Sequence, residues 1–140
     1  MARRILVPLD GSPQAQEALR YALDTFPEAT IVLVHVLTPV DGGVGADGLL
    51  SDPAGVVDDQ RERAEELFDD AEATAGDDRA VERELLAGRP ATEIVGCVEE
   101  YDIDQIVMGS HGRDGAARLL LGSVSETVVR RSPVPVTVVR

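Results

Sequence analysis

The chain has 140 residues, of which 44% are hydrophobic but only 3% aromatic, and this favours one domain over residues 1–140 with an aliphatic core. Its net charge of −13 argues against nucleic acid or an anionic membrane as a partner. All 13 basic residues are arginine, so the sequence excludes a Walker A lysine, a Schiff-base lysine and a lysine general base.

The first part of the chain predicts two buried strands with a helix between them. Residues 4–9 and 30–37 are continuous apolar runs, which are typical of central strands. Ser12 can cap a helix that begins at Pro13 and ends before Pro27. Residues 38–55 contain five glycines and no periodicity, so we expect a mobile loop there.

The middle of the chain predicts a helix, a strand and a second helix. The helix over residues 56–75 has an apolar face and an acidic face, and we expect the acidic face to be solvated. Residues 81–86 predict a strand whose polar centre suits a sheet edge. The next helix follows Pro90, and Cys97 lies beside its apolar face. Because Cys97 has no CxxC neighbour or histidine partner, a semi-buried structural role is favoured over a reactive thiol.

The last three elements complete an α/β fold. Residues 105–108 predict a strand, residues 123–131 a helix and residues 133–139 a fifth strand that contains Pro135. The alternation predicts a three-layer α/β/α fold with a five-stranded parallel sheet. The polar third strand and the proline-containing fifth suit the edges, so right-handed crossovers give the order 3-2-1-4-5. Strands one and four then lie side by side where the winding reverses, and ligands bind beyond the carboxyl ends at such a point.

Two loops, residues 8–12 and residues 109–123, meet at this predicted crevice. Gly109 and Gly112 would let the backbone approach a ligand closely. The pair Gly122-Ser123 precedes a helix, whose first N–H groups lack backbone partners and favour a phosphate. The sequence therefore predicts a phosphate-holding loop at the end of a parallel strand.

Several candidate residues have a structural explanation beside the functional one. Asp10 can accept hydrogen bonds from ribose hydroxyls, but an aspartate before glycine also forms turns. Ser123 and Glu126 match the S-x-x-E capping box. Arg113 and Arg118 are either phosphate ligands or solvated surface arginines.

One proline and two histidines also bear on the site. Pro8 inside a central strand forfeits a ladder hydrogen bond, and such a violation favours a functional position. His35 lies in a central strand, where we expect a hydrogen-bonded core histidine, and His111 lies in the glycine loop. Without nearby cysteines or paired carboxylates, the two histidines do not predict a metal site.

The spacing G-x2-G-x9-G-S, from Gly109 to Ser123, resembles the nucleotide-binding signature of the universal stress protein (UspA-like) family, in its ATP-binding branch. The opening ILVPLDGS and the second strand VLVHV resemble the same family, so the likeness spans essentially the whole chain. It implies a Rossmann-like fold of the adenine-nucleotide alpha-hydrolase type, which often dimerises. No motif position departs from the family's pattern.

The resemblance also implies a set of ATP-binding residues. Pro8, Leu9 and Asp10 would line adenine and ribose. The backbone of Val36 would read the adenine edge, with Met108 packing nearby. The residues implied around ribose and phosphates are Gly109, Gly112, Gly122, Ser123, Val124 and Ser125, with Arg113 as a candidate phosphate partner. Mg²⁺ would be held mainly through the phosphates.

Three functions stay open at this stage. The leading one is an ATP-responsive regulator in the stress response. The second is a slow ATPase or nucleotidyl transferase in which Asp10 or His111 positions water, although no base–orienter pair is evident. The third is a dimeric interaction module that does not depend on nucleotide. The missing GxGxxG after the first strand argues against a Rossmann oxidoreductase.

Composition and the last strand add expectations about surroundings and assembly. Residues 134–139 are apolar at an edge, so we expect a homodimer through this strand. The N-terminal apolar run is too short for a signal peptide, no run approaches the roughly 20 residues of a membrane span, and the single cysteine fits a reducing compartment. We therefore expect a cytoplasmic protein. An acidic, lysine-free surface fits either a halophilic source or a GC-rich genome that favours arginine codons.

Overall fold

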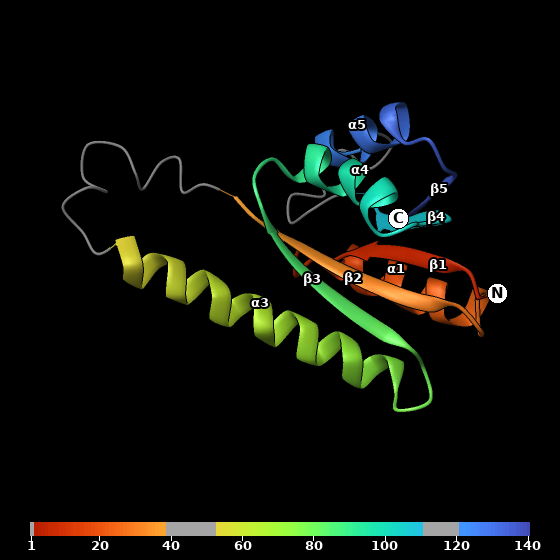
Figure 1. The fold of residues 1–140 in the computed structure, drawn as a ribbon, viewed down its shortest axis with the longest axis horizontal. Helices are drawn as coiled ribbons and strands as arrows, with labels where there is room; N and C mark the ends of the chain where they lie inside the picture. The colour runs from red at the N-terminus through yellow and green to blue at the C-terminus, as the bar shows by residue number, and fades with distance from the viewer. Residues whose placement is uncertain (1, 39–52, 111–120) are drawn as a thin grey trace.

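The computed structural model describes residues 2–38, 53–110 and 121–140 (Figure 1). Five parallel strands form one sheet in the order β3-β2-β1-β4-β5, which confirms the predicted topology. The strands are β1 (Arg4–Pro8), β2 (Thr30–Leu37), β3 (Val81–Ala87), β4 (Gln105–Gly109) and β5 (Val136–Val139). The helices are α1 (Pro13–Thr25), α3 (Pro53–Ala75), α4 (Pro90–Glu100) and α5 (Ser123–Arg131).

The sheet separates two aliphatic cores, one on each face. Side chains alternate across a strand, so Ile5 and Val7 of β1 face α1 and α3, whereas Leu6 faces α4 and α5. In Figure 1, α4 and α5 lie above the strands and α3 lies below them. The buried residues of β1 and β2 are all apolar, as expected of central parallel strands that are covered on both faces.

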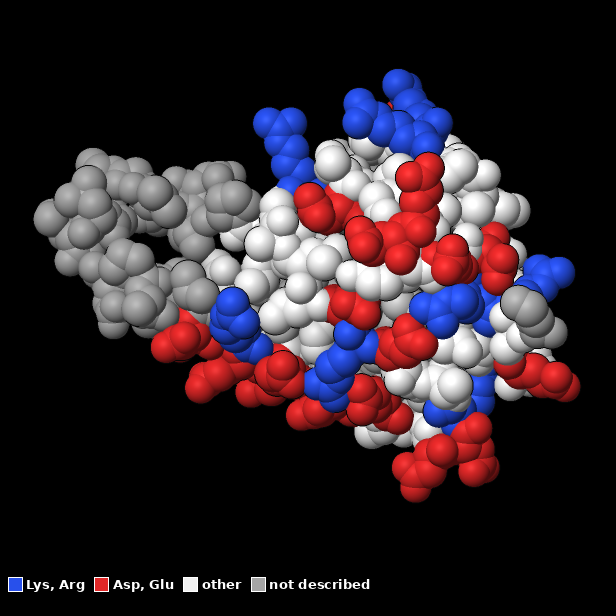
Figure 2. Space-filling view, viewed as in Figure 1, with Lys and Arg blue, Asp and Glu red and all other residues white. Residues whose placement is uncertain are grey.

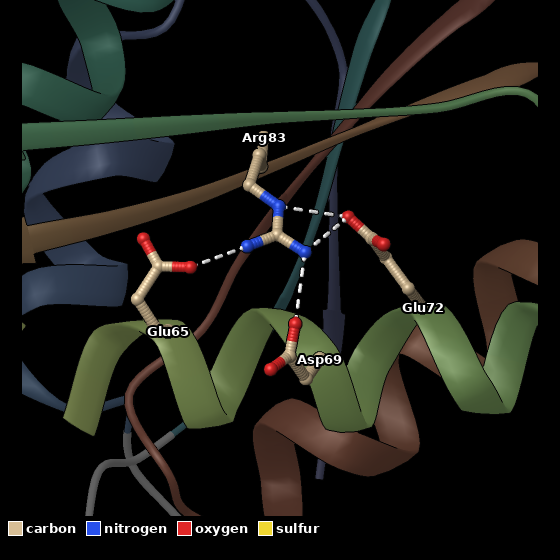
Figure 3. A network of polar contacts seen from close by, with 4 residues as sticks. All are labelled: Glu65, Asp69, Glu72 and Arg83. Atoms are coloured by element: carbon tan, nitrogen blue, oxygen red, sulfur yellow. Dashed lines mark hydrogen bonds and ion pairs between the residues drawn. The ribbon is translucent and has the colours of Figure 1, made fainter. Parts of the chain in front are cut away.

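The edge strand β3 is fastened to α3 by one arginine. Arg83 donates from Nη1 to Glu65 at 2.7 Å and from Nη2 to Asp69 at 3.1 Å, and its Nε lies 2.8 Å from Glu72 (Figure 3). Its guanidinium also lies 5.1 Å from the centre of the buried Phe68 ring. The polar centre of β3 therefore sits at an edge as predicted, and part of the acidic face of α3 is bound to Arg83 rather than only solvated.

Several element boundaries differ from the sequence prediction, and β3 ends at Ala87, one residue beyond its predicted end. Pro8 is the last residue of β1, so its missing N–H falls at the strand end, and Leu9 N still donates to Val34 O at 2.8 Å. β5 begins at Val136, and Pro135 precedes it with its carbonyl accepting from Ile106 N at 3.0 Å. β4 extends to Gly109, one residue beyond the predicted end, and pairs there with Val139. α3 begins at Pro53, inside the predicted loop, and residues 39–52 of that loop lie outside the described residues.

Acidic side chains follow α3 along the lower edge of the molecule, with arginines among them (Figure 2). Some arginines are paired, as Arg20 is with Glu17 and Arg130 with Glu126. With 26 acidic against 13 basic residues, such pairing leaves a large uncompensated negative charge. Within the described ranges, no helix has the length and apolar character to cross a membrane.

The turn after α4 places an aspartate in the left-handed region. Asp102 has φ 55°, and Ile103 N donates to Val98 O at 2.9 Å, the bond that closes a Schellman turn. Ile103 and Val98 are both buried in the core on this face. A β-carbon disfavours this conformation, and the aspartate carboxylate is unfavourable near the negative end of the helix dipole.

Substitutions at Asp102 measure this backbone cost. Asp102→Gly and Asp102→Ala remove the same carboxylate, so their difference isolates the effect of the β-carbon at positive φ. We expect the glycine variant to be more stable than the alanine variant by about 1 kcal/mol in urea denaturation. Equal stability of the two variants, or a more stable alanine variant, would contradict the backbone assignment.

The charge imbalance predicts stabilisation by salt. Raising KCl shortens the Debye length from about 10 Å at 0.1 M to about 3 Å at 1 M, which screens repulsion between like charges. Because carboxylates outnumber arginines two to one, we expect repulsion to outweigh the screened ion pairs and the melting temperature to rise with KCl. A flat or falling melting temperature in calorimetry would show that the acidic surface is not adapted to salt.

Candidate functional site

A cavity of about 850 Å³ opens at the carboxyl ends of the strands, where β1 lies beside β4. Its lining combines the end of β1, the end of β4 and the start of α5, together with one side of α3. This is the point where the winding of the sheet reverses, so the cavity lies where the sequence predicted a crevice.

The loop after β1 holds itself in shape through its own polar groups. Ser12 N donates to Asp10 Oδ1 at 2.9 Å, and Ala15 N donates to Ser12 Oγ at 3.1 Å. Gly11 has φ +84°, the left-handed region that glycine adopts without penalty. Asp10 therefore forms a turn, as its structural explanation expects, and it uses one carboxylate oxygen to do so. Its carboxylate is exposed and lines the crevice.

Gly109 is required for packing at this point. A β-carbon at Gly109 would lie 2.7 Å from Gln14 Cβ and 3.0 Å from Ala15 N. No real β-carbon tolerates such contacts with the first turn of a helix, so the missing side chain lets α1 rest on the end of β4. This explanation is independent of any ligand, and it places the loop that carries Asp10 beside the end of β4.

The described residues on either side of residues 111–120 are bound to each other. Gly122 N donates to Ser110 O at 2.7 Å, and Ser110 N donates to Val139 O at 2.8 Å. Ser125 is buried, and its hydroxyl donates to the same Ser110 carbonyl at 2.7 Å and to Gly122 O at 3.1 Å. The side chain of Ser125 therefore lines the crevice while its hydrogen bonds hold the two backbone segments together.

The predicted capping box of Ser123 and Glu126 is wrong. Gly122 is the N-cap of α5, with no side-chain cap, and Glu126 N donates to Gly122 O at 2.9 Å. The bond between Gly122 and Ser110 fixes where the helix begins, one residue earlier than a Ser123 cap requires. Ser123 is thus the first helical residue, exposed and lining the crevice.

The other end of the crevice is apolar. Leu9, Val36 and Met108 line it, together with Pro90 and Ile94 of α4. Leu9 belongs to the core beneath α1 and α3 and Met108 to the core beneath α4 and α5, so both cores reach the crevice at the strand ends. Such a wall can hold a planar apolar ring, whereas the opposite end offers hydroxyls, glycines and carboxylates.

One flank of α3 and the side chain of His35 also line the crevice, and neither was among the predicted site residues. Gln60, Arg63 and Glu66 of α3 line the crevice, with Leu67 and Asp70. Their spacing of three and four places them on one side of a helix, but sequence spacing does not reveal which side faces the site. His35 also lines it, half-buried, with Nδ1 donating to Leu9 O at 2.7 Å. It is hydrogen-bonded, as expected, but at the crevice rather than deep in the core.

Four candidate residues of the glycine loop, His111, Gly112, Arg113 and Arg118, lie outside the described residues. Cys97 is buried, and burial raises the pKa of its thiol to about 11, which fits the predicted structural role. In the part of the chain that the structure describes, no group of three or more His, Cys, Asp or Glu side chains could hold a metal ion.

Comparison with known proteins gives a consistent family. A model of the universal stress protein family matches residues 1–140. The universal stress protein MJ0577 of Methanocaldococcus jannaschii is 32% identical, covering 100% of this chain and 96% of the relative. A universal stress protein of Methanothermobacter thermautotrophicus is 36% identical, with 100% and 97% covered.

Solved structures agree with the sequence comparison. A structure of the protein MJ0577 superposes with a TM-score of 0.83 at 30% identity, covering 99% of this chain and 96% of that one. A universal stress protein in complex with cAMP has a TM-score of 0.64 at 24% identity, with 99% and 96% covered, and shares the fold. The match along the full sequence and the shared sheet order lead to one conclusion: this chain belongs to the universal stress protein family.

Proposed function

We propose that residues 1–140 act as one cytoplasmic universal stress protein domain that binds an adenine nucleotide, ATP, in the crevice and serves as a nucleotide-responsive regulator. One observation carries this proposal. A single cavity joins an apolar wall to a polar end that is built from an exposed carboxylate and the start of a helix. An adenine nucleotide has the same sequence of parts: a planar base, a ribose and phosphates.

The base belongs at the apolar wall in this proposal. Leu9 and Met108 reach the crevice from the cores on the two faces of the sheet, and the backbone of Val36 at the end of β2 offers polar atoms to the edge of the ring. Adenine presents both a ring face and an edge of hydrogen-bonding groups, so it can use both features. The cAMP complex of a protein with this fold makes adenine nucleotides the natural first ligands to test.

The ribose and phosphates belong at the polar end. Asp10 keeps one carboxylate oxygen in its turn and has an exposed side chain, which leaves room for a ribose hydroxyl to donate to it. Gly122 caps α5 and its N–H is bound to Ser110 O, so the N–H groups of the first turn, which begins at Ser123, and the helix dipole favour a phosphate. Val124 and Ser125 continue the same turn and line the cavity.

A path for regulation runs from the crevice to the edge of the sheet. Ser110 lines the crevice, and its N–H donates to Val139 O in β5. All four residues of β5 are partly exposed at an edge that offers unpaired backbone groups. We propose that β5 pairs with a second copy of the chain, so that a nucleotide beside Ser110 would act on the dimer edge.

An interaction module that ignores nucleotide is the second candidate. The observation that favours it is the packing of Gly109 on α1, because this glycine is needed whether or not a ligand binds. Equal affinity for a client protein with and without ATP would favour this candidate over the first.

Asp10 provides a direct test of nucleotide binding. Asp10→Asn keeps an oxygen that can accept from Ser12 N, and so keeps the turn, but it removes the charged acceptor. We expect ATP affinity to fall about fivefold in calorimetry, because a charged acceptor contributes more than a neutral one.

The matched ligand control for Asp10 is 2′,3′-dideoxyATP, which has no ribose hydroxyls. Its affinity should be the same for the wild-type protein and for Asp10→Asn. If the wild-type protein binds no ATP, the proposed function is wrong. If Asp10→Asn weakens both ligands equally, Asp10 does not bind the ribose.

Removal of Mg²⁺ should weaken ATP binding. Three carboxylates, Asp10, Glu66 and Asp70, line the described crevice against one guanidinium, so a bare triphosphate meets net negative charge. Mg²⁺ held on the phosphates would offset that repulsion. We therefore expect EDTA to lower ATP affinity about tenfold. Adenosine, which has no phosphate, is the control and should be unaffected. Equal ATP affinity with and without Mg²⁺ would contradict the role of these carboxylates.

A further inference from the structure

The helix α3 shows two different flanks on either side of its buried stripe. Ala64, Phe68 and Ala71 face the core. At 100° per residue, Glu65, Asp69 and Glu72 lie on one flank, where they bind Arg83 of β3 (Figure 3). The opposite flank carries the residues that line the crevice: Gln60, Arg63, Glu66, Leu67 and Asp70. The buried stripe and the Arg83 cluster thus hold α3 in a rotation that presents the second flank to the site.

The position of Arg63 relative to the sheet follows from the direction of α3. Asp70 and Leu67 lie next to the loop after β1, since a β-carbon on Gly11 would stand 3.6 Å from Leu67 Cδ2. α3 begins on the carboxyl side of the sheet and runs back to the start of β3. Arg63 is seven residues before Asp70, about 10 Å farther out along the helix axis. It therefore lines the outer part of the crevice, beyond the strand ends.

Arg63 is also the single cation among the described lining residues. Asp10, Glu66 and Asp70 supply three carboxylates, so the charge of this lining is negative. The guanidinium of Arg63 makes no hydrogen bond or ion pair with any described residue, in contrast to Arg83 and Arg4. An exposed, unpaired guanidinium in a carboxylate-lined crevice is free to bind an anionic group of a ligand.

We propose that Arg63 is a specificity-determining residue that binds the terminal phosphates and so distinguishes ATP from AMP. The inference rests on the proposed nucleotide site. A nucleoside held at the sheet by the apolar wall and Asp10 would extend its phosphates outward, and the outer part of the crevice is where Arg63 lies. The phosphate attached to ribose would sit closer to the start of α5, so AMP would depend little on Arg63.

Arg61 offers a matched control. It is an exposed arginine on the same helix, two residues from Arg63, and no described residue pairs with it. The helical rotation places it on the flank that faces Arg83, and it does not line the crevice. Arg61→Gln therefore removes the same charge from the same helix without touching the site. Circular dichroism melting of each variant checks that the fold is kept.

The experiment measures ATP, ADP and AMP affinities by calorimetry with Mg²⁺ at constant ionic strength. For Arg63→Gln we expect ATP affinity to fall about tenfold, with ADP affinity falling less. AMP affinity should stay within about twofold, and Arg61→Gln should stay within about twofold for all three nucleotides. Arg63→Lys keeps the charge without the planar fork, so its ATP affinity should lie between those of wild type and Arg63→Gln.

The outcomes separate this inference from the proposed function. If the wild-type protein binds ATP but Arg63→Gln binds it equally well, or loses ATP and AMP affinity to the same extent, the inference is wrong and the proposed function stands. If Arg61→Gln lost as much ATP affinity as Arg63→Gln, the cause would be the loss of a distant positive charge, and the inference would also be wrong. If the wild-type protein binds none of the three nucleotides, the proposed function fails and the inference with it.

Discussion

The arrangement of the site depends on the absence of a side chain at Gly109. A β-carbon there would overlap the first turn of α1, so only glycine lets α1 rest on the end of β4. That contact brings the Asp10 loop beside the Gly109–Ser110 backbone at the reversal of the sheet. The hydrogen bonds from Gly122 and Ser125 to Ser110 then hold the start of α5 at the same place. The packing at Gly109 and the hydrogen bonds to Ser110 together assemble three segments that are distant in the sequence.

A second constraint decides what faces the crevice from α3. The buried stripe of Ala64, Phe68 and Ala71 sets which side of the helix rests on the sheet. Arg83 reinforces that rotation by binding carboxylates on a single flank, with its guanidinium near the Phe68 ring. These ion pairs are exposed, so each contributes little stability, but together they fasten one flank of α3 to β3. The opposite flank of α3 therefore faces the crevice, where Arg63, Glu66 and Asp70 carry its charges.

The fold could be predicted from the sequence because apolar runs and helix caps locate the strands and helices. The polarity of the third strand and the proline of the fifth then indicate the sheet order. The crevice could be located for the same reason, since topology alone places it. The roles of individual site residues could not be predicted in the same way. Ser123 matched a capping box, but the Gly122–Ser110 bond starts the helix one residue earlier. The crevice flank of α3 was missed because spacing shows which side of the helix is apolar, but not which polar flank meets the crevice and which meets Arg83.

The central claim is that an adenine nucleotide occupies the crevice at the reversal of the sheet. Amide hydrogen exchange with and without saturating MgATP tests it most directly, because the readout covers backbone groups on every wall. The account predicts slower exchange at residues 9–12, at residues 122–125 and around Arg63, with little change at the amino ends of the strands. Unchanged exchange at all three segments in the presence of ATP, or protection confined to another surface, would contradict it.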